Sequence, residues 1–161
     1  MLSDAERHEI EREMARYPDP KAASVEALKV VQERRGWISD DMLAEVARLL
    51  GMSEAELEGV ATFYSLLFRR PVGDHVVLVC DSVSCWLLGS ERIVETFRAR
   101  HGVGLGETTG DGRFTLLPIP CLGASDGAPA IMVDGDLHRN VEPERLDEIL
   151  DAYPAAGEGR R

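Results

Sequence analysis

The spacing of hydrophobic residues changes near residue 70 and divides the chain in two. From residue 3 to residue 68, apolar side chains recur three and four positions apart, which is typical of helices facing a core. Four helices are expected, beginning near Ser3, Pro20, Ser39 and Ser53. Ser3 with Glu6, and Ser53 with Glu56, have the capping-box spacing of helix starts. Short connections predict a small antiparallel bundle, with most of the run Phe63 to Phe68 in its core.

After residue 70 the pattern becomes that of strands with intervening helices. The β-branched run from His75 to Cys80 predicts a strand buried on both faces. It is followed by an expected helix at 91–100, a strand at 114–119, a hairpin of strands at 130–133 and 137–140 turning at Asp134-Gly135, and a helix at 143–153. This order predicts helices packed on a mixed sheet, of which the thioredoxin-like arrangement is one example. We therefore expect an α+β protein with two domains, residues 1–70 and 71–161.

Composition and charge narrow the classes of function. The 161 residues include 29 acidic and 18 basic side chains, giving a net charge of -11. Binding to nucleic acid or to an anionic membrane surface requires a cationic face, so both are disfavoured. The first ten residues are charged, and no uncharged apolar run approaches the ~20 residues of a membrane-spanning helix. We expect a cytoplasmic protein without direct membrane insertion.

The cysteines are the residues most informative about chemistry. Their odd number, in a chain without an export signal, argues against a disulfide framework. Cys80 ends a predicted strand, Cys85 follows after four residues, and Cys121 lies just past the next predicted strand. Strand ends can bring thiolates together, and this spacing lets a loop wrap a cluster of two irons.

Two other interpretations of the cysteines stay open. They can be buried as small hydrophobes, or they can bind zinc, although structural zinc sites usually pair two C-x(2-4)-C motifs. The small residues of segments 81–85 and 121–129 favour an iron-sulfur cluster, because their backbone N–H groups can turn toward its sulfides.

Long blocks of the sequence are similar to a known family. They are DPKAASVEAL (19–28), RGWI (35–38), EGVATFY (58–64), RPVG (70–73), CDS (80–82), DGRFTLLP (111–118) and CLG (121–123). Over roughly residues 10–153 the chain resembles the small 2Fe-2S (24 kDa, E-type) subunit of the NADH-dehydrogenase module of bacterial respiratory complex I.

The resemblance implies a helical N-terminal domain, a thioredoxin-like ferredoxin domain and a 2Fe-2S cluster on four cysteines spaced C-x4-C and C-x3-C. Three ligand positions match Cys80, Cys85 and Cys121, and the fourth falls on Ser125. A serine alkoxide keeps the charge of the cluster unchanged but is a harder donor than sulfur and favours ferric iron. We expect a cluster ligated by Ser125 to be harder to reduce and more easily lost.

The resemblance also implies a role and partners. The chain is expected to be an electron-transfer subunit of NADH:quinone oxidoreductase without a substrate-converting site of its own. Its expected partners are a flavoprotein carrying FMN and the NADH site and the large iron-sulfur subunit. Residues 1–70 are expected to dock on the flavoprotein. Through the complex, the chain would lie on the cytoplasmic side of the inner membrane. One alternative is a clusterless structural subunit that stabilises the flavoprotein. Another is the equivalent small subunit of an NAD-linked formate dehydrogenase or hydrogenase.

Overall fold

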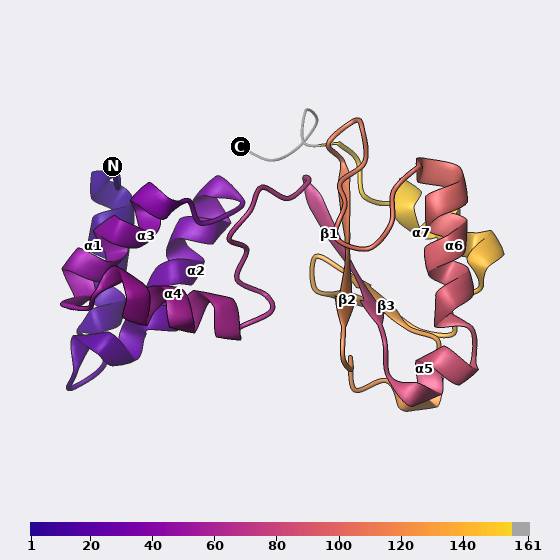
Figure 1. Cartoon of the computed structure of the whole chain (residues 1–161), viewed down its shortest axis with the longest axis horizontal. Helices are drawn as coiled ribbons and strands as arrows, with labels where there is room; N and C mark the ends of the chain where they lie inside the picture. The colour runs from indigo at the N-terminus through magenta and orange to yellow at the C-terminus, as the bar shows by residue number, and fades with distance from the viewer. Residues whose placement is uncertain (156–161) are drawn as a thin grey trace. The chain divides into compact units, whose positions relative to one another are not determined.

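A computed structural model describes residues 1–155 and divides the chain into two compact units, Met1–Pro71 and Val72–Arg161. The first unit is helical and the second combines helices with a four-stranded sheet (Figure 1). The α+β class expected from the pattern is confirmed. Within residues 1–155, no helix has the length and apolar character needed to cross a membrane.

The N-terminal unit contains the four expected helices and one additional 3-10 turn. Its elements are α1 (Asp4–Met14), η1 (Pro20–Ala23), α2 (Ser24–Arg35), α3 (Asp40–Leu50) and α4 (Glu54–Phe63). Ser3 and Ser53 each form a complete capping box, as expected. The second helix begins later than Pro20, because residues 20–23 form the 3-10 turn and regular α-helix starts only at Ser24.

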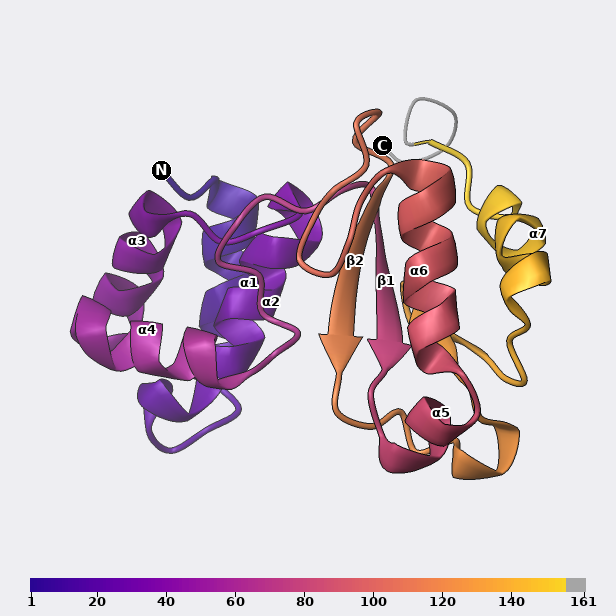
Figure 2. The same cartoon turned by 45° about the vertical axis from the view of Figure 1, so that its right-hand side comes forward.

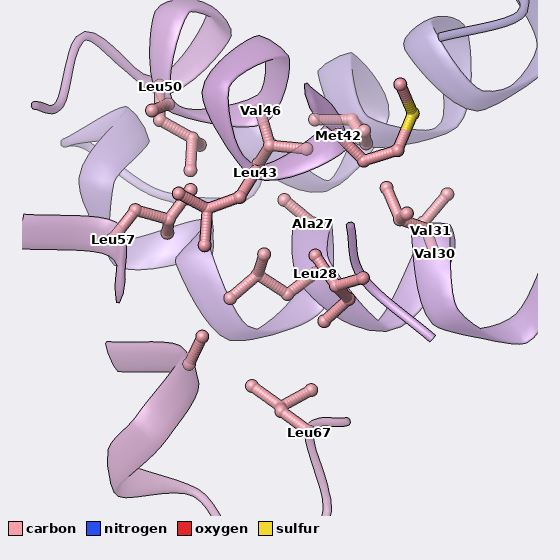
Figure 3. Packing of buried hydrophobic residues seen from close by; sticks show 14 of the residues in the cluster. Ala27, Leu28, Val30, Val31, Met42, Leu43, Val46, Leu50, Leu57 and Leu67 are labelled. Carbon is pink, nitrogen blue, oxygen red and sulfur yellow. The ribbon is translucent and has the colours of Figure 1, made fainter. Parts of the chain in front are cut away.

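The core of this unit lies between its helices: α1 contributes the completely buried Ile10, and Figure 3 shows side chains of α2, α3 and α4 packed against one another. Leu28, Val46 and Leu57 are completely buried there, and each such side chain contributes roughly 1.5–3 kcal/mol through removal from water. The expectation that most of the run Phe63 to Phe68 serves in the core is wrong. The side chain of Phe63 is 79% exposed, and only Leu67 in this run is buried, because α4 ends at Phe63 and the chain leaves the bundle irregularly.

The C-terminal unit is built on a sheet with strand order β2-β1-β3-β4. Its elements are β1 (His75–Cys80), α5 (Val83–Leu87), α6 (Ser90–His101), β2 (Phe114–Ile119), η2 (Ser125–Gly127), β3 (Ile131–Val133), β4 (Asp136–His138), η3 (Pro143–Arg145) and α7 (Leu146–Asp151). β1 pairs in parallel with β2, with Cys80 opposite Ile119, and β3 and β4 form the expected hairpin. The carboxyl ends of β1 and β2 therefore lie at the same edge of the sheet, with α5 just beyond them (Figure 2).

Two helices cover one face of this sheet. Val77 and Val79 of β1 are buried in one cluster with Phe97 of α6 and with Leu146 and Leu150 of α7. Figures 1 and 2 show α6 and α7 on the same side of the strands. The packing of α6 and α7 against β1 holds this strand in place and thereby positions its last residue, Cys80.

Candidate metal centre

Cys80 lies at the end of β1 and is 2% exposed. Its Sγ is 3.3 Å from the hydroxyl oxygen of Ser82. Burial raises the pKa of the Cys80 thiol, but hydrogen bonds from Ser82 and from the backbone N–H of Leu122 outweigh burial and lower the pKa overall. Groups that stabilise a thiolate also stabilise a sulfur ligand of a metal. Cys80 is therefore suited to act as a ligand.

Cys85 lies in α5 and is buried next to Cys80. Ser82 caps this helix, since its hydroxyl accepts a hydrogen bond from the N–H of Cys85 at 3.4 Å. Burial raises the pKa of the Cys85 thiol, and its interaction with Cys80 raises the pKa further. Both cysteines share one apolar cluster with Ala124, Ala128 and Ala130. The interpretation of residues 81–85 as a loop is wrong, because α5 begins within that segment.

Cys121 and Ser125 lie in the segment that follows β2. Cys121 is exposed, and its Sγ accepts a hydrogen bond from the N–H of Gly123 at 3.2 Å. Ser125 is also exposed and begins the 3-10 turn η2. Because β1 and β2 run in parallel, Cys121 lies at the same edge of the sheet as Cys80. The N–H of Leu122 reaches the thiol of Cys80, so this segment passes beside the buried cysteines.

The structure brings Cys80 and Cys85 together and leaves Cys121 outside that pair. In the part of the chain from residue 1 to residue 155, no three histidine, cysteine, aspartate or glutamate side chains are grouped so that they could hold a metal ion. All three cysteines are free thiols. Two of the four candidate ligands, Cys80 and Cys85, therefore lie together, and the other two, Cys121 and Ser125, lie on the neighbouring loop.

Two contributions to this site were missed by sequence reasoning. The hydroxyl of Ser82 contacts Cys80 and caps the helix of Cys85, and the backbone of Leu122 donates to Cys80. Serine three residues before Cys85 has the spacing of a helix cap, and this was the available signal for α5. No side-chain pattern identifies the N–H of Leu122.

The donor set suits an iron-sulfur cluster. Thiolate sulfur is the ligand that such clusters select, and reduction is tuned by hydrogen bonds to the sulfurs and by exclusion of water. Cys80 and Cys85 are buried, a backbone N–H points at Cys80, and both cysteines share an apolar cluster with alanines and partly buried leucines. These are the surroundings such a group requires.

Apolar side chains are exposed around this site. Four of them, in and just after α5, are between 51% and 70% exposed: Val83, Trp86, Leu87 and Leu88. They follow or flank Cys85 directly in the sequence. The surface beside the buried thiols is therefore unusually apolar for an acidic chain.

Comparison with known proteins agrees with the resemblance seen in the sequence. The family model described as thioredoxin-like [2Fe-2S] ferredoxin matches residues 10–154. The chain is 51% identical over 153 residues to the E-type subunit of the NADH-quinone oxidoreductase of Pseudomonas aeruginosa, which covers 95% of this chain and 92% of that protein. It is 49% identical over 152 residues to the corresponding protein of Escherichia coli K12, with 94% and 92% covered.

A solved structure shares the fold. An NAD+-reducing [NiFe]-hydrogenase in the air-oxidized state superposes with a TM-score of 0.70 at 23% identity, covering 81% of this chain and 22% of that chain. At this identity the likeness shows the fold alone. Because the family model spans nearly the whole chain and the two bacterial relatives are about half identical to it, the chain belongs to the thioredoxin-like [2Fe-2S] ferredoxin family.

Proposed function

We propose that this chain is the electron-transfer subunit of an NADH:quinone oxidoreductase, which holds a 2Fe-2S cluster and exchanges one electron with the FMN of an NADH-oxidising partner subunit. The observation that carries the proposal is the 51% identity, over 95% of the chain, to the E-type subunit of the Pseudomonas aeruginosa NADH-quinone oxidoreductase. The buried pair of cysteines at the edge of the sheet supports it.

The ligands in this proposal are Cys80, Cys85, Cys121 and Ser125. When bound, a 2Fe-2S cluster accepts and releases one electron at a time, whereas a hydride delivers two. Cys80 and Cys85 offer two buried sulfurs. The exposed segment 121–125 would supply the third sulfur, from Cys121, and the oxygen of Ser125. Hydrogen bonds from Ser82 and Leu122 hold negative charge on Cys80.

The proposed partners are the flavoprotein that carries FMN and the NADH site and, beside it, the large iron-sulfur subunit. Residues 1–70 are proposed as a docking element, supported by the exposed apolar side chains of Phe63, Tyr64 and Leu66. The chain would then be peripheral, on the cytoplasmic side of the inner membrane. It has no nucleic-acid partner in this proposal, in keeping with its net charge of -11.

A second candidate is a structural subunit that keeps the fold, lacks the cluster and stabilises the flavoprotein. Ser125 favours it, because serine stands where the family pattern expects the fourth cysteine. The likeness to a hydrogenase does not favour the hydrogenase or formate-dehydrogenase assignment, since it shows the fold alone.

Anaerobic reduction by NADH separates the two candidates. The chain is assembled with the flavoprotein, NADH is added, and electron paramagnetic resonance is recorded. A signal of one unpaired electron per chain, absent without NADH and absent in Cys80→Ala, is expected from the electron carrier. An assembled complex that shows no such signal and contains no iron establishes the structural role.

A further inference from the structure

A pocket of about 350 Å³ opens beside Cys80 in the C-terminal unit. It is lined by residues of α6, by the ends of β1 and β2, and by the loop after α6. Figure 2 shows α6 alongside these two strands. Val79, Val94 and Leu105 contribute an apolar surface to the pocket. Such a surface suits the aliphatic part of a ligand or of a side chain.

Three carboxylates surround this apolar surface. Asp81, Glu91 and Glu95 line the pocket, and none of the three is buried. Among residues 1–155 none of the three side chains has a hydrogen-bond or ion-pair partner. The guanidinium of Arg98 lies against Gly104, next to the pocket-lining Leu105. Three carboxylates against this one guanidinium leave the pocket with an excess of negative charge, which favours a cation.

A buried hydroxyl is available in the same pocket. Ser90 lines it, is 4% exposed, and its side chain has no hydrogen-bond partner within the described residues. No fully enclosed side-chain oxygen or nitrogen in that range lacks a partner, so the Ser90 oxygen must reach solvent. Since Ser90 is otherwise buried and lines the pocket, its hydroxyl reaches solvent through the pocket. The pocket thus offers a hydrogen-bond acceptor in addition to the carboxylates.

We propose that this pocket receives an arginine side chain of the flavin-carrying partner subunit. An arginine stem packs on apolar surface while its planar guanidinium presents five N–H donors, enough to serve several carboxylates and a hydroxyl together. Lysine has a compact, strongly hydrated charge and matches a spread acceptor set less well. This inference rests on the proposed function, because that function supplies the partner.

The surroundings of the pocket favour a protein as the source of the arginine. Ser90 follows α5 after two residues, and the exposed apolar side chains Trp86, Leu87 and Leu88 come shortly before it in the sequence. An apolar patch beside a charged pocket is typical of a protein interface, with the charges giving specificity and association rate. The interface would include Cys80, which electron exchange requires to be near the flavin.

The test uses the double variant Glu91→Gln/Glu95→Gln of the full chain. The probe is the purified flavin-carrying subunit from the same organism, and association is recorded at about 0.05 M and about 0.3 M salt. We expect the association rate at low salt to fall about tenfold and its salt dependence to flatten, since steering charges act mainly on that rate. Leu105→Arg, which places a guanidinium in the pocket in cis, is expected to weaken binding as well.

The matched control is Glu142→Gln/Asp151→Asn, which removes two exposed carboxylates of the same unit outside this pocket. It should bind like the unaltered chain. Normal binding of the flavin-carrying subunit by the Glu91/Glu95 variant overturns this inference but leaves the proposed function standing. The same holds if the control variant weakens binding equally, or if the Glu91/Glu95 variant changes only the association of the chain with itself. Failure of the unaltered chain to bind the flavin-carrying subunit contradicts both the inference and the proposed partner. Circular dichroism and iron content, unchanged across the variants, establish that fold and site are intact.

Discussion

Glu6 is a single carboxylate that ties the first two helices together. Its side chain is 3% exposed and meets Arg35 through Nε and Nη2, each at 2.7 Å, while also accepting the N–H of Ser3. The hydrogen bond from Arg35 is the main cause that lowers the pKa of Glu6 from 4.5 to about 2. The pKa in the folded state is below the unfolded value, so the pair stabilises the fold above pH 4.5 and loses this effect as pH falls toward 2.

The variant Glu6→Gln is expected to lower the free energy of unfolding by about 2 kcal/mol at pH 7, because Arg35 loses a charged, two-point partner. Near pH 2 the difference from the unaltered chain should almost vanish. Urea unfolding followed by circular dichroism at both pH values measures this. Glu13→Gln is the control, since its partner Arg16 is largely exposed and the effect should stay below about 0.5 kcal/mol. An equal loss at both pH values would contradict the assigned role.

At the scale of elements, the sequence predicted those with a visible period or cap. α1 and α4 carry capping boxes, and β1 is a continuous β-branched run, so each lies where its pattern placed it. α5 was missed because its five residues are too few to show a helical period. The run Phe63 to Phe68 was misassigned to the core. An apolar segment looks the same in the sequence whether its side chains pack in a core or stay exposed on the surface.

α5 depends on the cap that Ser82 provides. Ser82→Ala removes the acceptor for the N–H of Cys85 and the contact with Cys80. We expect thermal unfolding of the C-terminal unit to show a loss of about 1 kcal/mol, with iron content reduced in the purified chain. Ser82→Thr keeps a capping hydroxyl and should restore both. If Ser82→Ala retains full stability and iron, the helix cap does not position the cysteines.

At the scale of the whole molecule, the candidate site is less predictable than the fold. The pattern placed Cys80 and Cys121 at strand ends, and the parallel pairing of β1 and β2 in the structure brings both to one edge of the sheet. The arrangement of segment 121–125 depends on backbone hydrogen bonds such as that from Leu122 to Cys80, which leave no mark in the side-chain pattern. The sequence therefore identified the candidate ligands but not their separation into a buried pair and an exposed loop.

The proposed docking role of the helical unit predicts a pattern of hydrogen exchange. When the flavoprotein is added to the full chain, backbone amides around Phe63 to Leu66 should exchange more slowly, because these exposed apolar residues become covered. Amides in the buried part of α2 serve as the internal reference, since they are protected in both states. No added protection anywhere in residues 3–68 removes the docking role.

Iron and acid-labile sulfide, measured per chain after anaerobic purification, test the central claim most directly. The account predicts two irons and two sulfides per chain, as one 2Fe-2S cluster requires. Ser125→Ala should lower both, and Ser125→Cys should slow the loss of the cluster and make the cluster easier to reduce, because sulfur replaces a harder oxygen donor. Near-zero iron in a chain that still assembles with the flavoprotein would contradict the account.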